Sequence, residues 1–136
     1  MNRALIDTGA IYALVSAADG HHPDAVDFLT GWVRRKGIFL LSDLVFFETM
    51  TLAKRRLGAG TAIRIGRELR GNTLFTRISL TAELEQETWN VFQSYEDKEW
   101  SYTDCSLLVL SNRMKVANIF AFDDHFRQMP GLRCLP

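Results

Sequence analysis

The stretch LIDTGAIYAL, residues 5–14, predicts the fold class of this chain. The apolar residues 3–6 have the length of a short buried strand, Asp7-Thr8-Gly9 has the composition of a turn, and residues 10–17 can continue as a helix. The order strand, turn, helix is the opening unit of an α/β domain.

The same alternation continues to the end of the chain. Short apolar strands with little polar alternation indicate a parallel sheet that is covered by helices on both faces. The chain has 136 residues, so we expect one α/β domain, residues 1–136, with a central, mostly parallel sheet of about five strands. Strands are expected over residues 3–6, 38–41, 74–78, 118–122 and 132–135, and helices over 10–17, 23–36, 43–57, from the break at 58–60 to about 71, 81–95 and 101–112.

Composition and charge exclude several classes of protein. Sixteen basic residues balance sixteen acidic residues, so the net charge does not indicate a membrane or nucleic-acid partner. No apolar run approaches the roughly 20 residues of a membrane span, and Asp7 interrupts the apolar stretch that could imitate a signal peptide. Cys105 and Cys134 lack metal-ligand spacing and fit free thiols in a cytoplasmic protein.

Acidic side chains follow two of the expected strands. Asp7 ends the first strand, and Asp123 ends the strand NIFAF before a second aspartate, Asp124. Because the carboxyl ends of parallel strands meet at one edge of a sheet, we expect Asp7 and Asp123 to be neighbours. Glu48 and Asp104 lie near the starts of two helices that can point to the same edge, and the apolar neighbours of Glu48 indicate a mostly buried face.

A cluster of carboxylates needs a cation, because like charges within a few ångströms repel one another. Oxygen ligands without a nearby His or Cys select Mg²⁺ or Mn²⁺ over zinc, and such ions commonly serve phosphoryl transfer. Each acid also has a structural alternative. Asp104 completes a capping box with Ser101, Asp7 can cap its helix, Glu48 can pair with a surface base, and strand alternation places Asp123 and Asp124 on opposite sides.

Four motifs in order, LIDTGAIYAL, FFETMTLA, SYTDCSLLVL and IFAFDDHF, resemble those of PIN-domain ribonucleases, and the chain length resembles that of VapC-type toxins from toxin–antitoxin pairs. The resemblance spans the whole chain. It departs from the family pattern at Gly9, where the family often has Ser. It implies a three-layer α/β/α sandwich and a metal-dependent endoribonuclease whose products carry a 5′-phosphate and a 3′-hydroxyl.

The resemblance also implies residue roles and partners. Asp7, Glu48, Asp104 and Asp123 match the acidic positions that bind one or two Mg²⁺ or Mn²⁺ ions, with Asp123 favoured over Asp124 by the following His125-Phe126. Thr8, Asp97, Thr103 and Asp124 are expected to support the site without binding metal. The expected partners are RNA, a small antitoxin that inserts a basic side chain into the acidic pocket, and a second copy in a homodimer.

An acidic pocket repels RNA, so cations elsewhere must hold the substrate. The helix after residue 60 presents Arg64, Arg67 and Arg70 opposite its apolar face, with three further cations at residues 54–56. A solvated helix face is the structural alternative. Two other functions stay open at this point: a non-catalytic binding module whose acids only cap helices, and a related metal-dependent DNA nuclease.

Overall fold

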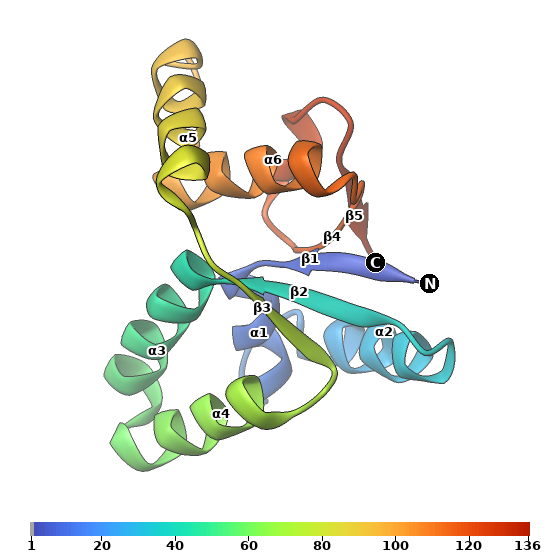
Figure 1. The fold of residues 1–136 in the computed structure, drawn as a ribbon. Helices are drawn as coiled ribbons and strands as arrows, with labels where there is room; N and C mark the ends of the chain where they lie inside the picture. The colour runs from blue at the N-terminus through green and yellow to red at the C-terminus, as the bar shows by residue number, and fades with distance from the viewer. Residues whose placement is uncertain (1) are drawn as a thin grey trace.

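The computed structural model describes residues 2–136, which form a five-stranded parallel sheet with helices on both faces (Figure 1). The strand order is β3-β2-β1-β4-β5, and every neighbouring pair is parallel. The strands are β1 (Arg3–Ile6), β2 (Ile38–Ser42), β3 (Phe75–Ile78), β4 (Asn118–Phe120) and β5 (Arg133–Leu135). The helices are α1 (Thr8–Val15), α2 (His22–Arg34), α3 (Asp43–Leu57), α4 (Ala59–Gly71), α5 (Ala82–Ser94), α6 (Tyr102–Met114) and the 3₁₀ helix η1 (Asp124–Gln128).

The crossovers divide the helices between the two faces. The chain steps from β1 to β2 to β3 in one direction, and then returns through α5 and α6 to β4 on the other side of β1. Because parallel crossovers are right-handed, this reversal puts α1 to α4 on one face and α5 and α6 on the other, as Figure 1 shows. The predicted α/β/α sandwich is confirmed, and its strand order reverses between β1 and β4.

The sheet is the centre of the hydrophobic core. Leu5, Ile6, Phe39, Ile119 and Phe120 are fully buried, and the rings of Phe39 and Phe120 stack 5.5 Å apart. This explains why the strands show little polar alternation, since both of their faces are covered. Within residues 2–136, no helix has the length and apolar character needed to cross a membrane.

Helix boundaries follow local capping rules at most ends. Ser42 accepts a hydrogen bond from the amide of Val45 and Thr81 accepts one from Leu84, which begins α3 and α5 at the expected positions. Gly37 is required where α2 ends, because a Cβ atom there would lie 2.3 Å from the ring of Trp32.

Four local expectations are wrong. Helix α1 begins at Thr8 and not at residue 10, and α4 begins at Ala59, inside the expected break. Strand β4 ends at Phe120 and not at residue 122, because the chain turns from residue 121 toward η1. Strand β3 begins at Phe75 and not at residue 74.

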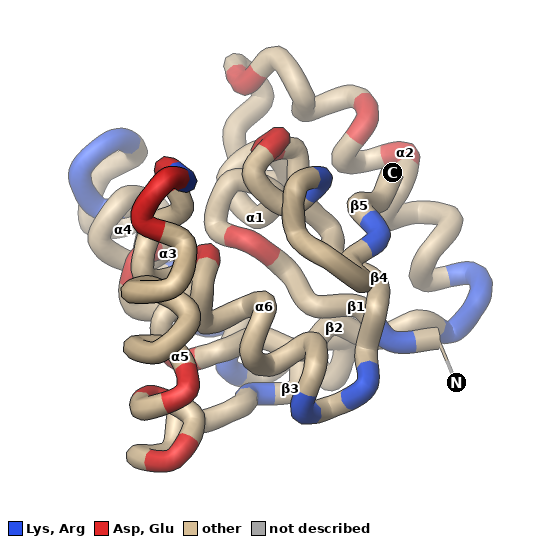
Figure 2. The backbone as a smooth tube through the Cα atoms, turned by 90° about the horizontal axis from the view of Figure 1, so that it is seen from above, with Lys and Arg blue, Asp and Glu red and all other residues tan. Residues whose placement is uncertain are grey.

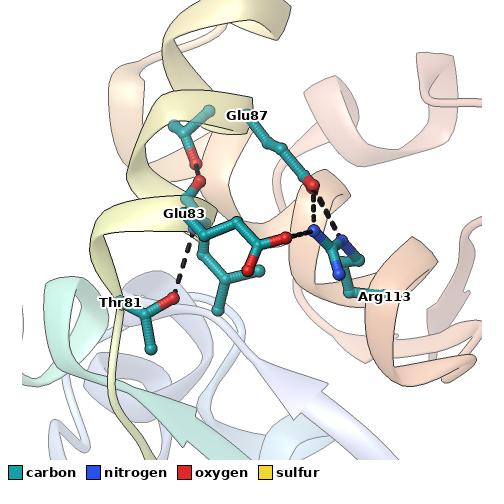
Figure 3. A network of polar contacts seen from close by, with 6 residues as sticks. Thr81, Glu83, Glu87 and Arg113 are labelled. Carbon is teal, nitrogen blue, oxygen red and sulfur yellow. Dashed lines mark hydrogen bonds and ion pairs between the residues drawn. The ribbon is translucent and has the colours of Figure 1, made fainter.

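Charges on the helices are unevenly distributed, as the sequence predicts. Acidic residues follow one another along α5, whereas the last turn of α3 is basic (Figure 2). Arg113 of α6 pairs with Glu83 and Glu87 of α5, and its Nε lies 2.8 Å from Glu87 Oε1 (Figure 3). These ion pairs are exposed and therefore weak, but they link α5 to α6, the helix that carries Asp104.

Candidate metal centre

Asp7 lies where β1 ends and α1 begins, at the point where the strand order reverses. Its amide donates a hydrogen bond to the carbonyl oxygen of Phe120 at 3.1 Å, which joins the ends of β1 and β4. Its side chain is only 9% exposed and makes no capping hydrogen bond to α1, although it occupies the N-cap position. Helix capping therefore does not explain why a carboxylate is buried here.

Asp104 lies in the first turn of α6 and takes part in the predicted capping box. Its amide donates to Ser101 Oγ, and its Oδ2 accepts from the Ser101 amide, both at 3.0 Å. The cap fixes the side chain, which is 8% exposed, and the negative charge of Asp104 acts on Asp7. The capping alternative is thus correct for Asp104, but capping does not account for the proximity of this carboxylate to Asp7.

Asp123 and His125 come from the segment that follows β4. His125 Nδ1 lies 3.0 Å from Asp104 Oδ2 and 3.5 Å from Asp123 Oδ1, and the His125 amide donates to Asp123 Oδ1 at 2.9 Å. One ligand atom from each of Asp104, Asp123 and His125 lies within 4.8 Å of the others. Both aspartates of the doublet are exposed, but Asp124 pairs with Arg127 at 3.5 Å, whereas Asp123 shares the group of ligand atoms with Asp104 and is therefore the one that faces it.

The pKa values of Asp7 and His125 are both raised above their ordinary values. Burial raises the pKa of Asp7 to about 7, with further increases from the negative charges of Asp104 and Glu48 and an opposing effect of the Thr8 and Gly9 amides. The hydrogen bond with Asp104 is the main cause that raises the pKa of His125, and the charge of Asp123 adds to it. Asp7 and Asp104 are therefore buried carboxylates that destabilise one another when both are ionised.

Glu48 occupies a different environment from the one predicted. Its side chain and that of Phe47 are exposed on α3, and Phe47 is 57% exposed, so the expectation of a mostly buried face is wrong. Glu48 lines a shallow cavity of about 310 Å³ together with Arg55. Its charge still raises the pKa of Asp7, which places it at the rim of the centre.

The four residues expected to support the site lie in different environments, two of them at least half-buried and two of them exposed. Thr8 follows Asp7 and is buried, and within residues 2–136 its hydroxyl has no hydrogen-bond partner. Thr103 is half-buried beside Asp104, and its carbonyl oxygen accepts from Ser106 Oγ. Asp97 and Asp124 are exposed, and in the described part of the chain Asp97 has no hydrogen bond or ion pair.

The expected arginine face exists on α4. Arg64, Arg67 and Arg70 are exposed opposite the buried face formed by Ala62, Ile65, Gly66 and Leu69. The guanidinium of Arg70 lies 5.8 Å from the ring centre of Phe46, on the helix that carries Glu48, whereas Arg64 borders an apolar groove between α1, α2 and α4. These cations therefore do not form one cluster with the carboxylates.

His125 is a member of the site to which the sequence assigned no role in the carboxylate group. The expectation that no histidine lies near the carboxylates is wrong, because His125 contacts both Asp104 and Asp123. The signal was present in the spacing Asp123-x-His125, where a turn brings a side chain back to the residue two positions earlier.

The donor set fits a divalent cation. Among residues 2–136, no Lys or Arg forms an ion pair with Asp7, Asp104 or Asp123, and His125 pairs with Asp104 and Asp123 but not with Asp7. Asp7 is buried beside the charge of Asp104, and the buried hydroxyl of Thr8 has no hydrogen-bond partner among residues 2–136, so a cation here would offset charge and offer a polar contact that the protein does not supply. Asp7, Asp104 and Asp123 would hold the ion, with Glu48 at the rim.

A parallel sheet with carboxylates at the reversal of its strand order is suited to a protein that binds a metal ion and acts on phosphodiesters. The PIN domain matches residues 4–132, and the chain belongs to this family, with VapC-type toxins as its relatives.

Two relatives support this assignment, and a further solved structure shares the fold. VapC20 of Mycobacterium tuberculosis, a 23S rRNA-specific endonuclease, is 28% identical over 89% of this chain and 89% of its own length. Its crystal structure, described as that of a sarcin-ricin loop cleaving toxin, has a TM-score of 0.84 at 26% identity and covers 93% of this chain and 95% of that chain. A VapC ribonuclease of Archaeoglobus fulgidus is 30% identical over 90% of this chain and 78% of its own length. VapBC2 of Rickettsia felis, at 12% identity, shares the fold with a TM-score of 0.71 over 98% of this chain and 97% of that chain.

Proposed function

We propose that this chain cuts ribosomal RNA at the centre formed by Asp7, Asp104 and Asp123, as the toxin of a toxin–antitoxin pair. The observation that carries this function is the placement of two buried carboxylates, Asp7 after β1 and Asp104 in α6, so that burial and the charge of Asp104 raise the pKa of Asp7 to about 7, while the exposed Asp123 lies beside Asp104. The choice of ribosomal RNA rests on the relative from Mycobacterium tuberculosis, whose name states that substrate.

The protein side chains position the reactants. His125 Nδ1 is engaged with Asp104 Oδ2, so His125 orients the carboxylates and the remaining ligands are oxygen atoms. Oxygen ligands favour Mg²⁺ or Mn²⁺, and we propose one of these as the ion. When bound, the cation activates a water nucleophile and offsets charge on the phosphate. The Ser101 cap holds Asp104 in place, and the burial of Asp7 limits access of bulk water.

The partners follow from the same centre. A basic side chain of an antitoxin would neutralise Asp7 and Asp104, the buried carboxylates that lack a Lys or Arg partner in residues 2–136. We also propose a homodimer, as in the family. The RNA substrate and the free thiols of Cys105 and Cys134 fit a reducing cytoplasmic location.

Cleavage of matched substrates tests the function. The purified protein with Mn²⁺ or Mg²⁺ should cut 23S ribosomal RNA at discrete positions and leave 5′-phosphate and 3′-hydroxyl ends, with transfer RNA and matched RNA and DNA hairpins as controls. EDTA should stop the reaction. Equal cleavage of the DNA hairpin would favour the DNA nuclease alternative, and no cleavage together with no metal-dependent rise in melting temperature would favour a binding module.

Substrate holding by α4 is a separate prediction. Arg64→Glu with Arg67→Glu should lower kcat/KM for RNA by about ten-fold or more and flatten its salt dependence, because phosphate contacts are lost. Both side chains are exposed, so the melting temperature should change by only a few degrees. Arg34→Glu, an exposed arginine in the last turn of α2, is the matched control. Unchanged cleavage by the double variant would remove α4 from the substrate path.

A further inference from the structure

A second cavity, of about 540 Å³, lies at the end of α5 and the start of α6. Its lining includes Trp89, Phe92, Tyr95, Glu96, Glu99 and Trp100. None of these residues belongs to the metal centre, and the ribonuclease function proposed above assigns no role to them.

The aromatic side chains of this cavity are exposed to an unusual degree. Trp89 is 46% exposed and Phe92 is 40% exposed, and their rings stack 6.0 Å apart with an angle of 27° between their planes. Deeper in the cavity, Trp100 is buried and its ring centre lies 4.5 Å from that of Tyr95. Large rings exposed together in a concave site indicate a ligand that stacks on them.

The cavity adjoins the elements that carry the metal centre, α6 and η1. Cys105, which follows Asp104 in α6, lines the cavity, and Trp100 directly precedes Ser101, which caps α6 through Asp104. Trp100 Nε1 donates a hydrogen bond to Gln128 Oε1 at 3.1 Å, and Gln128 ends η1, the element that contains His125. A ligand in the cavity would therefore contact residues that directly precede and follow the Ser101–Asp104 cap and that are hydrogen-bonded to η1.

The polar groups at the cavity select one class of ligand. Glu96 and Glu99 are hydrogen-bond acceptors that repel phosphate, whereas the exocyclic amino groups of guanine, adenine and cytosine are donors that suit them. Lys98 is the cation of this lining and can meet the backbone of the same nucleotide. A protein surface that covered Trp89 and Phe92 would bury the two carboxylates as well, which is costly without matched donors.

We propose that this cavity receives an unstacked nucleobase of the RNA, next to the phosphate that is cut, and that it prefers guanine, adenine or cytosine over uracil. The proposal rests on the ribonuclease function of the adjacent centre. Single-stranded RNA is commonly recognised by stacking of splayed bases on aromatic rings, combined with hydrogen bonds to base edges. The aromatic rings supply the stacking, and Glu96 and Glu99 accept from the amino group that uracil lacks.

Nucleotide binding and cleavage test the proposal independently. Tryptophan fluorescence of the protein should be quenched by GMP more strongly than by UMP, and hardly at all by ribose 5-phosphate. Trp89→Ala with Phe92→Ala should abolish this difference and lower kcat/KM for RNA by about ten-fold or more, while Trp89→Phe alone retains most activity. Val33→Ala, an apolar side chain of α2 that is 52% exposed, is the control and should change neither quantity.

The outcomes separate this proposal from the proposed function. Base-independent quenching, or full cleavage by the double variant, would overturn the nucleobase site even if the wild-type protein cuts RNA. A double variant that becomes monomeric while its base preference is unchanged would assign the surface to a second copy. Loss of RNA cleavage in the wild type with base-selective quenching intact would instead contradict only the ribonuclease function.

Discussion

Asp7→Asn is expected to reduce RNA cleavage by at least about a thousand-fold and, at the same time, to make the metal-free protein more stable at neutral pH. The loss of activity follows because asparagine removes a negative ligand from the centre. The gain in stability follows because the burial of the Asp7 carboxylate raises its pKa from 3.8 to about 7.

The sign of the pH dependence follows from this raised pKa. The folded state binds the Asp7 proton more tightly than the unfolded state, so this contribution to stability is complete below pH 3.8 and is lost as the pH rises through about 7. At pH 8 the buried charge costs up to about 4 kcal/mol, roughly 10 °C in melting temperature for a domain of this size. Asparagine does not titrate, so the variant should escape this cost.

Thermal denaturation with EDTA from pH 4 to pH 8 measures the effect. The melting temperature of Asp7→Asn should exceed that of the wild type at pH 8, and the two should converge toward pH 4. Added Mn²⁺ should stabilise the wild type at pH 8 and have little effect on the variant. Equal metal-free stability of the two proteins at pH 8 would show that the Asp7 carboxylate is not destabilised by its surroundings.

The second large effect on RNA cleavage is expected at Asp123, and its neighbour Asp124 provides the comparison. Asp123→Asn should lower kcat for RNA cleavage by about a hundred-fold or more, because Asp123 shares one group of ligand atoms with Asp104 and His125. Asp124→Asn should leave cleavage within about two-fold, because Asp124 points to Arg127 at 3.5 Å. The two variants make the same chemical change one residue apart, so each serves as the control for the other.

Single-turnover cleavage with Mn²⁺ titration distinguishes these variants. Asp123→Asn should also shift the metal concentration needed for half-maximal rate upward, whereas Asp124→Asn should not. A larger loss at Asp124 than at Asp123 would mean that the segment after β4 turns over when metal and RNA bind.

Local sequence patterns are sufficient to predict some elements of this fold but not their exact ends. The order of strands and helices could be predicted because apolar runs, Ser42, Thr81 and Ser101 mark the elements by interactions within a few residues. The start of α1 and the end of β4 could not be predicted. After Phe120 the chain leaves the sheet through contacts with η1 and β5, and no pattern in the neighbouring residues marks these contacts.

The candidate site was predictable in part for the same reason. Asp7 and Asp104 follow from their places after a strand and at a helix start. Glu48 was misjudged because apolar neighbours on a helix point in several directions, and Phe47 faces solvent. The contact of His125 with Asp104 could not be predicted, because it depends on a turn that brings its ring to a residue 21 positions earlier in the chain.

By itself, the sequence determined the α/β/α class, the family and the acidic residues, because periodicity and motif order are properties of neighbouring residues along the chain. Only the tertiary structure decided that Asp123 and not Asp124 faces Asp104, that His125 joins them, and that burial shifts the proton affinity of Asp7. Electrostatic interactions and desolvation depend on distances through space, and those distances exist only once the strand order has brought β1, α6 and the end of β4 together.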